Sequence, residues 1–157
     1  MNIVKTWQTR STSSEATERL GEAIGARLRG GEIIELVSDL GGGKTTFTRG
    51  LARGAGSKDT VGSPTFTLNR EYDAPEFIIS HFDFYRLGEA GIVGDELAEV
   101  VGDSHYVTII EWGDIVHDVL PEERMTVRIN LDEADENARN VVVTYPESYN
   151  YVIEGIS

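Results

Sequence analysis

The first half of the chain alternates between helix-like and strand-like spacing of its apolar residues. Thr12 and Glu15 have the spacing of a capping box, and apolar residues recur at helical spacing as far as Leu28. An amphipathic helix is therefore predicted to open the domain and to end before Gly30-Gly31. The short, partly β-branched run Ile33–Val37 then predicts a strand buried on both faces, as in a parallel sheet.

The remaining pattern predicts one more strong helix and then mostly strands. Residues 44–53 contain no helix breaker except Gly50, and they place Phe47 and Leu51 on one helix face. Apolar and β-branched runs predict strands at 66–72, 77–82, 107–110, 125–131 and 141–145, with weaker helices at 95–101 and 115–119. This order predicts an α/β fold, with a mixed β-sheet flanked by helices. Residues 148–157 show no clear pattern, and we expect them to fray.

Composition narrows the class of protein. The 157 residues suit a single domain over 1–157. With no cysteine, the chain has no disulfides, no thiolate zinc site and no cysteine nucleophile. No stretch approaches the ~20 apolar residues of a membrane span, and the N-terminus lacks the order of a signal peptide, so we expect a cytoplasmic protein without membrane contact.

Charge is distributed unevenly. Residues 1–60 hold nine Lys/Arg against seven Asp/Glu, whereas residues 61–157 hold five against twenty, so the two parts carry +2 and -15 of the net -13. A phosphate ligand is therefore expected in the first part, and little direct binding of RNA or other nucleic acid is expected. The alternative is that the acidic part only contributes to the solubility of the protein.

A phosphate-binding motif lies between the predicted strand and the second helix. Residues 38–45 match the P-loop pattern G-x-x-x-x-G-K-[ST] at every fixed position except the first, where Ser38 replaces glycine. Backbone N–H groups of such a loop cradle phosphates, the lysine reaches the β and γ oxygens, and the hydroxyl after it can ligate Mg²⁺. The motif predicts a P-loop NTPase-like domain that binds ATP or ADP with Mg²⁺ through Asp39, Leu40, Gly41, Gly42, Gly43, Lys44, Thr45 and Thr46. A flexible glycine turn is the alternative, and the strand before and the helix after the loop argue against it.

Two carboxylates follow strand-like runs. Asp83 and Glu111 each end such a run, where α/β sheets present ligand groups, so both are candidate catalytic residues and, with Thr45, candidate magnesium ligands. Asp83 could instead cap a turn, and Glu111 could be an exposed acid. His81, a single histidine on a strand, is expected to be a satisfied core group, and core positions are favoured for Trp112.

Taken together, the motifs are similar to those of a known family. Residues 38–50, 63–68 (SPTFTL), 81–87 (HFDFYRL) and 110–112 (IEW) resemble the bacterial tRNA threonylcarbamoyladenosine biosynthesis family TsaE. The resemblance covers nearly the whole chain. The sequence departs from the family pattern at two places. Ser38 replaces the usual glycine, which affects the tight turn of the loop, and residues 88–104 differ in the helix expected to face a partner.

The resemblance implies a small P-loop ATPase that acts with the TsaB and TsaD subunits in tRNA N6-threonylcarbamoyladenosine (t6A) modification. It also implies that Ser63-Pro64-Thr65 is a γ-phosphate-sensing loop in which Thr65, like Lys44, is catalytic, with a rigid Ser-Pro turn as the alternative, and that the region of Ser14 borders the adenine. Arg139 either approaches the nucleotide or pairs with acidic neighbours, and the sequence leaves both open.

The sequence contains no evident arginine finger or isolated base, so we expect slow intrinsic hydrolysis that rises when a partner completes the site. Two alternatives stay open. One is a small P-loop kinase of a metabolite or nucleotide, and the other is a nucleotide-sensing adaptor that need not hydrolyse ATP.

Overall fold

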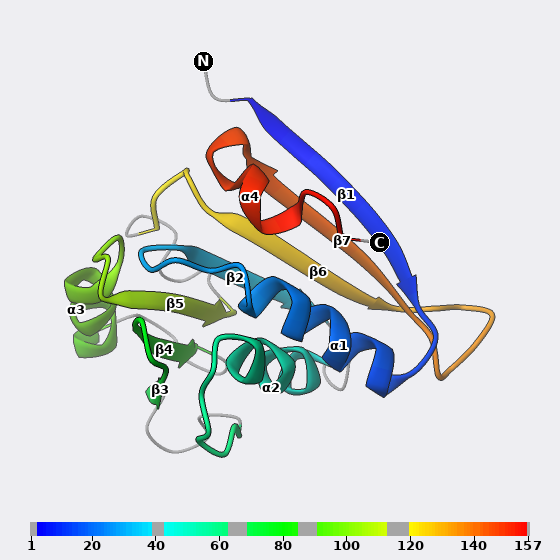
Figure 1. Cartoon of the computed structure of the whole chain (residues 1–157), viewed down its shortest axis with the longest axis horizontal. Coiled ribbons are helices and arrows are strands. Elements are labelled where there is room, and N and C mark those ends of the chain that lie inside the picture. The colour runs from blue at the N-terminus through cyan, green and yellow to red at the C-terminus, as the bar shows by residue number, and fades with distance from the viewer. Residues whose placement is uncertain (1–2, 39–42, 63–68, 85–90, 113–119, 157) are drawn as a thin grey trace.

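One seven-stranded sheet organises the protein (Figure 1). The structure is a computed structural model that describes residues 3–38, 43–62, 69–84, 91–112 and 120–156. The strands are β1 Val4–Ser11, β2 Ile33–Ser38, β3 Asn69–Asp73, β4 Ile78–Asp83, β5 Tyr106–Glu111, β6 Met125–Leu131 and β7 Arg139–Pro146. Their order across the sheet is β1-β7-β6-β2-β5-β4-β3.

The sheet is mixed, with a parallel centre and antiparallel edges. Strand β2 pairs in parallel with β5 and β6, and β4 pairs in parallel with β5. Pairings β1–β7, β6–β7 and β3–β4 are antiparallel. The predicted α/β fold with a mixed sheet is thus confirmed. Because β2, β4 and β5 are mutually parallel, their carboxyl ends meet at one edge of the sheet.

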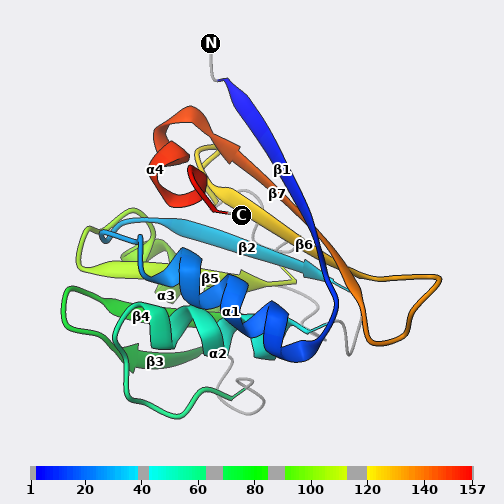
Figure 2. The same ribbon diagram turned by 45° about the vertical axis from the view of Figure 1, so that its right-hand side comes forward.

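Helices cover both faces, and each face has its own apolar core (Figures 1 and 2). The helices are α1 Ser14–Gly25, α2 Lys44–Gly54, α3 Gly91–Val100 and α4 Asn150–Ile153. The larger core joins apolar residues of α1, α2 and α4 to the sheet, including Ile24, Phe47 and Val152. The smaller core lies on the α3 side, where Leu97 packs with Phe82. Ile33 of β2 belongs to the smaller core, whereas Ile34 and Leu36 belong to the larger one, so β2 is buried on both faces, as its sequence predicts.

Helices α1 and α2 touch through their backbones, because glycines of each helix face the other. An added Cβ at Gly25 would lie 2.0 Å from the Leu51 carbonyl oxygen, and one at Gly50 would lie 1.9 Å from that of Glu18. Gly21 and Gly54 meet the opposite helix in the same way. This close approach fixes the position of α2 on the sheet, and therefore of the residues at its first turn.

Two predictions about the N-terminal region are wrong. The chain opens with strand β1, not with the helix, and the exposure of β1 side chains alternates along the strand. Its alternating exposure gave no apolar run, which is typical of an edge strand, and among the described strands its partner is β7. The helix cap is Ser13, whose hydroxyl accepts the Ala16 N–H at 3.1 Å, rather than Thr12, and α1 already ends at Gly25.

The C-terminal residues are ordered over most of the stretch that we expected to fray. A 3-10 turn, Glu147–Tyr149, leads into α4, and Tyr149, Val152 and Ile153 are buried. The Tyr149 hydroxyl accepts the Ile33 N–H at 3.0 Å, and the Tyr151 hydroxyl donates to the buried Glu32 carboxylate. These contacts tie the end of the chain to the start of β2.

Most of the other predicted elements are found with shifted ends. The strand at Met125–Leu131 has the predicted bounds, and α2 and α3 overlap their predicted helices. The predicted strand at 66–72 is described only from Asn69 onward, and the predicted helix at 115–119 lies outside the described residues.

Candidate functional site

The site lies where β2 ends and α2 begins. Ser38 is the last residue of β2, and Lys44 is the first residue of α2. Between them, Gly43 occupies the N-cap position with φ 108°, a left-handed conformation that favours glycine. Residues Asp39, Leu40, Gly41 and Gly42 lie outside the described residues. The strand–loop–helix order that the motif requires is present.

The Lys44 side chain points toward the end of the neighbouring strand β5. Its Nζ lies 3.6 Å from Oε1 of Glu111, and both side chains are nearly buried, with 10% and 4% exposed. The same Nζ lies 4.6 Å from the ring centroid of Trp112. The lysine charge is thus held between one carboxylate and one aromatic face, and its low exposure leaves it poorly hydrated.

Trp112 directly follows Glu111 and differs from the core position that we favoured. Its side chain is 37% exposed, and its φ of 57° lies in the left-handed region that non-glycine residues seldom adopt. This backbone turn at the end of β5 brings the indole ring over Lys44. Strained conformations of this kind cluster at functional sites.

The second oxygen of Glu111 belongs to a buried hydrogen-bond chain. Oε2 of Glu111 lies 2.5 Å from Nε2 of His81, and Nδ1 of His81 lies 3.3 Å from the Tyr72 hydroxyl. The Tyr72 hydroxyl donates to the Gly62 carbonyl at 2.8 Å. Burial raises the pKa of Tyr72 and keeps its phenol protonated. His81 is fully buried and hydrogen-bonded, as predicted, but its partner is the candidate catalytic carboxylate.

Asp83 lies beside Glu111. The two residues are register partners at the ends of β4 and β5, and the Phe84 N–H donates to the Glu111 carbonyl at 3.0 Å. The sheet thus presents two neighbouring carboxylates on the edge where β2 leads into α2.

A cavity of about 450 Å³ adjoins the first turn of α2. Its lining includes Gly43 and Thr46 from the phosphate motif, the start of α1 and the loop before β7. The full set of lining residues is Thr12, Ser13, Ser14, Glu15, Thr17, Gly43, Thr46, Glu136, Asn137 and Arg139. Ser14 and Arg139, which are far apart in sequence, therefore share one cavity with two residues of the motif.

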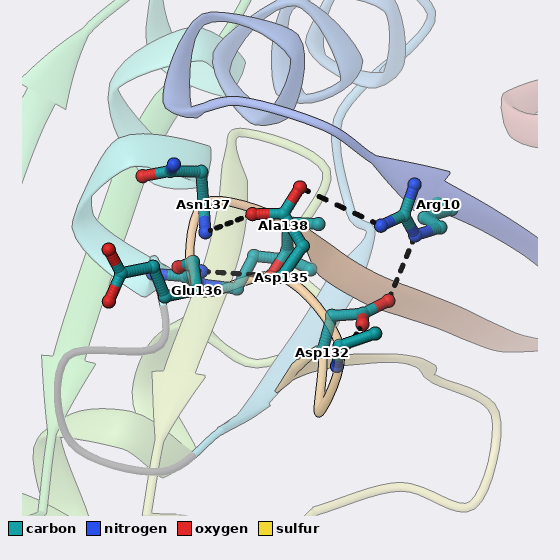
Figure 3. A network of polar contacts seen from close by, with 8 residues as sticks. Arg10, Asp132, Asp135, Glu136, Asn137 and Ala138 are labelled. Carbon is teal, nitrogen blue, oxygen red and sulfur yellow. Dashed lines mark hydrogen bonds and ion pairs between the residues drawn. The ribbon is translucent and has the colours of Figure 1, made fainter.

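The loop between β6 and β7 forms one wall of this cavity, and β1 holds it in place (Figure 3). Arg10 of β1 donates through Nε to Asp132 at 2.9 Å, and its Nη2 lies 3.8 Å from Asp135. Glu136 and Asn137 point away from these Arg10 contacts. The unpredicted strand β1 thus supports a loop that shapes the cavity.

Arg139 makes contacts that the sequence left undecided. Its Nη1 donates to the carbonyls of Glu136 and Ala138 at 2.8 and 2.9 Å, which fixes the guanidinium at the cavity wall. Arg139 thus lines the cavity with its Nη1 bound to the loop before β7.

The structure brings together many, though not all, of the predicted site residues. Lys44 and Glu111 are in contact, Asp83 adjoins them, and Thr45 is half-buried in the same turn of α2. Thr65 lies outside the described residues. Across the described ranges, no three His, Cys, Asp or Glu side chains form a metal-binding group by themselves.

Comparison with known proteins assigns the family. The model of the family described as "Threonylcarbamoyl adenosine biosynthesis protein TsaE" matches residues 11–141. This chain belongs to the TsaE family. Family proteins named tRNA threonylcarbamoyladenosine biosynthesis protein TsaE include one from Bacillus subtilis, 32% identical over 86% of this chain and 83% of its own length. Another, from Streptomyces coelicolor, is 39% identical over 80% of this chain and 87% of its own length.

A solved family structure shares the fold over almost the whole chain. The crystal structure of Bacillus subtilis YdiB matches with a TM-score of 0.80 and 29% identity, and it covers 98% of this chain and 95% of that one. The seven-stranded mixed sheet is therefore that of a known structure. Within the described part of this chain, no helix is long and apolar enough to cross a membrane.

Sequence reasoning missed several residues of the site. His81 contacts the Glu111 carboxylate, and Tyr72 contacts His81. Glu136 and Asn137 line the cavity. The spacing of two between His81 and Asp83 was a usable signal, since residues i and i+2 of a strand share a face. No sequence pattern marked Glu136 and Asn137, because the position of their loop depends on the Arg10 contacts.

Proposed function

We propose that the chain is the ATP-binding and ATP-hydrolysing component of the t6A modification machinery, with Mg²⁺ as the metal. The observation that carries this proposal is the buried Lys44 at the first turn of α2. Its ammonium faces Glu111 of the next parallel strand, and the adjoining cavity is large enough for part of a nucleotide. Membership of the TsaE family supports the biosynthetic role.

The residues of the site fit magnesium and nucleotide phosphates. The N-terminal turn of α2 directs backbone N–H groups at a phosphate, and Gly43 takes a conformation that leaves the main chain open to it. Magnesium prefers oxygen ligands and usually retains waters while it contacts phosphates. The Thr45 hydroxyl and the carboxylates of Glu111 and Asp83 are the oxygen donors available here. Bound Mg²⁺ would neutralise developing phosphate charge.

The cavity would take the base and sugar. It begins at Gly43 and Thr46 and extends between the start of α1 and the loop before β7. Ser14 and Arg139 are then the residues that contact the nucleotide farthest from the phosphates.

Hydrolysis is expected to be slow in the isolated chain and faster with partners. Mg²⁺ and Lys44 supply positive charge, but charge stabilisation during phosphoryl transfer usually needs a further group such as an arginine. We propose that docking to TsaB and TsaD completes or orders the site. The exposed Trp112, which contacts Lys44, is a route by which a docked partner reaches the phosphate-binding lysine.

The experiment that tests the function measures nucleotide binding and modification together. Titration with Mg·ATP and Mg·ADP should show binding by the wild type and at least a tenfold loss in Lys44→Ala, since the ammonium contacts phosphates directly. With tRNA, threonylcarbamoyl-adenylate, TsaB and TsaD, the wild type should support several modified adenosines per complex and Lys44→Ala should not. Wild-type binding without any effect on modification would refute the biosynthetic role and favour a P-loop kinase.

Replacing Glu111 tests whether hydrolysis is needed. Glu111→Gln keeps the size of the side chain and removes its charge, so we expect hydrolysis to fall while nucleotide binding persists. If modification continues at the wild-type rate without hydrolysis, the chain is a nucleotide-sensing adaptor.

A further inference from the structure

We propose that His81 and Tyr72 form a positioning relay that aims one oxygen of Glu111 at Lys44 and links it to the main chain at Gly62. The proposal rests on the function proposed above, and it concerns the same site. It gives a role to two buried residues that neither phosphate binding nor metal binding requires.

The two carboxylate oxygens of Glu111 have different partners. Oε1 faces Lys44 at 3.6 Å, and Oε2 is held by His81 at 2.5 Å. The terminal torsion of a glutamate is broad, so the backbone of β5 alone does not set the plane of the carboxylate. The contact with His81 does set it, because an ionised carboxylate only accepts hydrogen bonds and Nε2 of His81 must then donate. The other oxygen, Oε1, is thereby left to face Lys44 on the nucleotide side of the site.

The ring of His81 needs its own support. The second torsion of a histidine is also broad, and the Tyr72 hydroxyl, 3.3 Å from Nδ1, limits the rotation of the ring. The single proton of that hydroxyl goes to the Gly62 carbonyl at 2.8 Å, so the contact with His81 is a hydrogen bond in which Nδ1–H donates to the Tyr72 oxygen. Glu111, His81 and Tyr72 are 3%, 0% and 1% exposed, so bulk water is not available to replace a lost partner.

The relay therefore joins two segments that are far apart in sequence. Glu111 is at the end of β5, whereas Gly62 directly precedes the Ser63-Pro64-Thr65 sequence. A displacement of the Gly62 carbonyl would release Tyr72 and then His81, and the Glu111 carboxylate would lose its fixed plane. Outer partners that orient site carboxylates and imidazoles typically change activity by about 10–100-fold when removed.

Two substitutions of His81 separate positioning from mere core packing. In His81→Gln the amide nitrogen reaches the place of Nε2 and can donate to Glu111, whereas in His81→Asn it reaches only the place of Nδ1. Ser80→Ala is the matched control. Ser80 is the preceding residue of β4, is equally buried and donates to Asn69 at 3.3 Å, outside the relay.

With the full-length chain, its partners and Mg·ATP, we expect His81→Asn to lower kcat about tenfold with KM for ATP changed less than about twofold. Tyr72→Phe should lower kcat about threefold, and His81→Gln should recover most of the activity. Ser80→Ala should hydrolyse at the wild-type rate. Equal losses in His81→Gln and His81→Asn, or a loss confined to KM, would overturn the relay.

A second measurement examines the relay without catalysis. NMR of the imidazole nitrogens in the full-length, nucleotide-free protein, with His81 assigned by its loss in His81→Gln, should show the His81 signals shifted by Tyr72→Phe and by Glu111→Gln. They should be unmoved by Ser80→Ala. Unchanged His81 signals in Tyr72→Phe would refute the relay. If the wild type does not hydrolyse ATP, the proposed function fails, and the NMR comparison still decides the relay.

Discussion

Replacing Gly50 by alanine tests how closely α1 and α2 must pack. A Cβ at Gly50 would lie 1.9 Å from the Glu18 carbonyl oxygen, whereas real Cβ atoms essentially never come within 3.0 Å of such an atom. The helices would have to separate there by the difference, 1.1 Å. Since the opposing atom belongs to the backbone, no side-chain rotation relieves the clash.

Two opposing contributions set the expected size of the effect. Alanine is favoured over glycine inside a helix by about 1 kcal/mol. Forcing an extra methyl group into a close-packed contact destabilises a protein, and we use the upper end of the usual range, about 3 kcal/mol, because the opposing atom is backbone. Gly50→Ala should therefore lower the free energy of unfolding by about 2 kcal/mol. Phe47 and Leu51, both fully buried on the same helix, lose packing as α2 moves.

Urea unfolding monitored by circular dichroism measures this difference, with m-values compared between variants. Arg49→Ala is the matched control, because Arg49 is the adjacent exposed residue and its ion pair with Glu18 is a surface contact worth under about 1 kcal/mol. If Gly50→Ala is as stable as the wild type, or more stable, helix propensity outweighs the clash and our account of the α1–α2 contact is refuted.

Three further outcomes follow from contacts elsewhere in the sheet. The buried Thr108 hydroxyl has no hydrogen-bond partner among the described residues. Valine has nearly the same shape without the hydroxyl, so Thr108→Val should raise the free energy of unfolding by about 1 kcal/mol. A lower melting temperature in this variant would contradict the expectation. The hydrogen bond from Arg10 lowers the pKa of Asp132, so the stability that Asp132 contributes is present above its unfolded pKa of 3.8 and is lost as the pH falls through its folded pKa. The melting temperatures of wild type and Asp132→Asn should accordingly differ at neutral pH and converge in acid, and a gap that persists in acid would count against this contact. Burial raises the pKa of Tyr149 to about 12 from 10.0, so its contribution is complete below pH 10.0 and declines as the pH rises toward about 12. Tyr149→Phe should therefore flatten the alkaline loss of stability in a thermal unfolding series, and an unchanged slope would show that Tyr149 is not the titrating group.

Local sequence predicted the elements whose pattern is complete in itself. The apolar run of β2, the glycine-rich loop and the start of α2 are adjacent in the chain, so periodicity and motif located them together. The ends of β4 and β5 were also recognisable, because a carboxylate follows each apolar run. In a parallel sheet such ends meet at one edge, which is why Asp83 and Glu111 could be expected near the glycine-rich motif that follows β2.

Elements that depend on a distant partner escaped prediction. Strand β1 is polar and is held by β7, whose residues come more than a hundred positions later. Burial of Tyr149 and Val152 likewise requires the start of β2 and the larger core, so their local sequence gives no helical pattern. The close contact of α1 with α2 uses glycines that look like helix breakers when each helix is considered alone.

The sequence by itself determined the fold class, the position of the glycine-rich motif and the pair of strand-end carboxylates, because each rests on residues close together in the chain and on the geometry common to parallel sheets. Only the tertiary structure decided which oxygen of Glu111 faces Lys44, that His81 and Tyr72 hold the other, and that Ser14 and Arg139 share a cavity. Side-chain orientation and cavity shape arise from packing between segments that are far apart in sequence. No local periodicity carries that information.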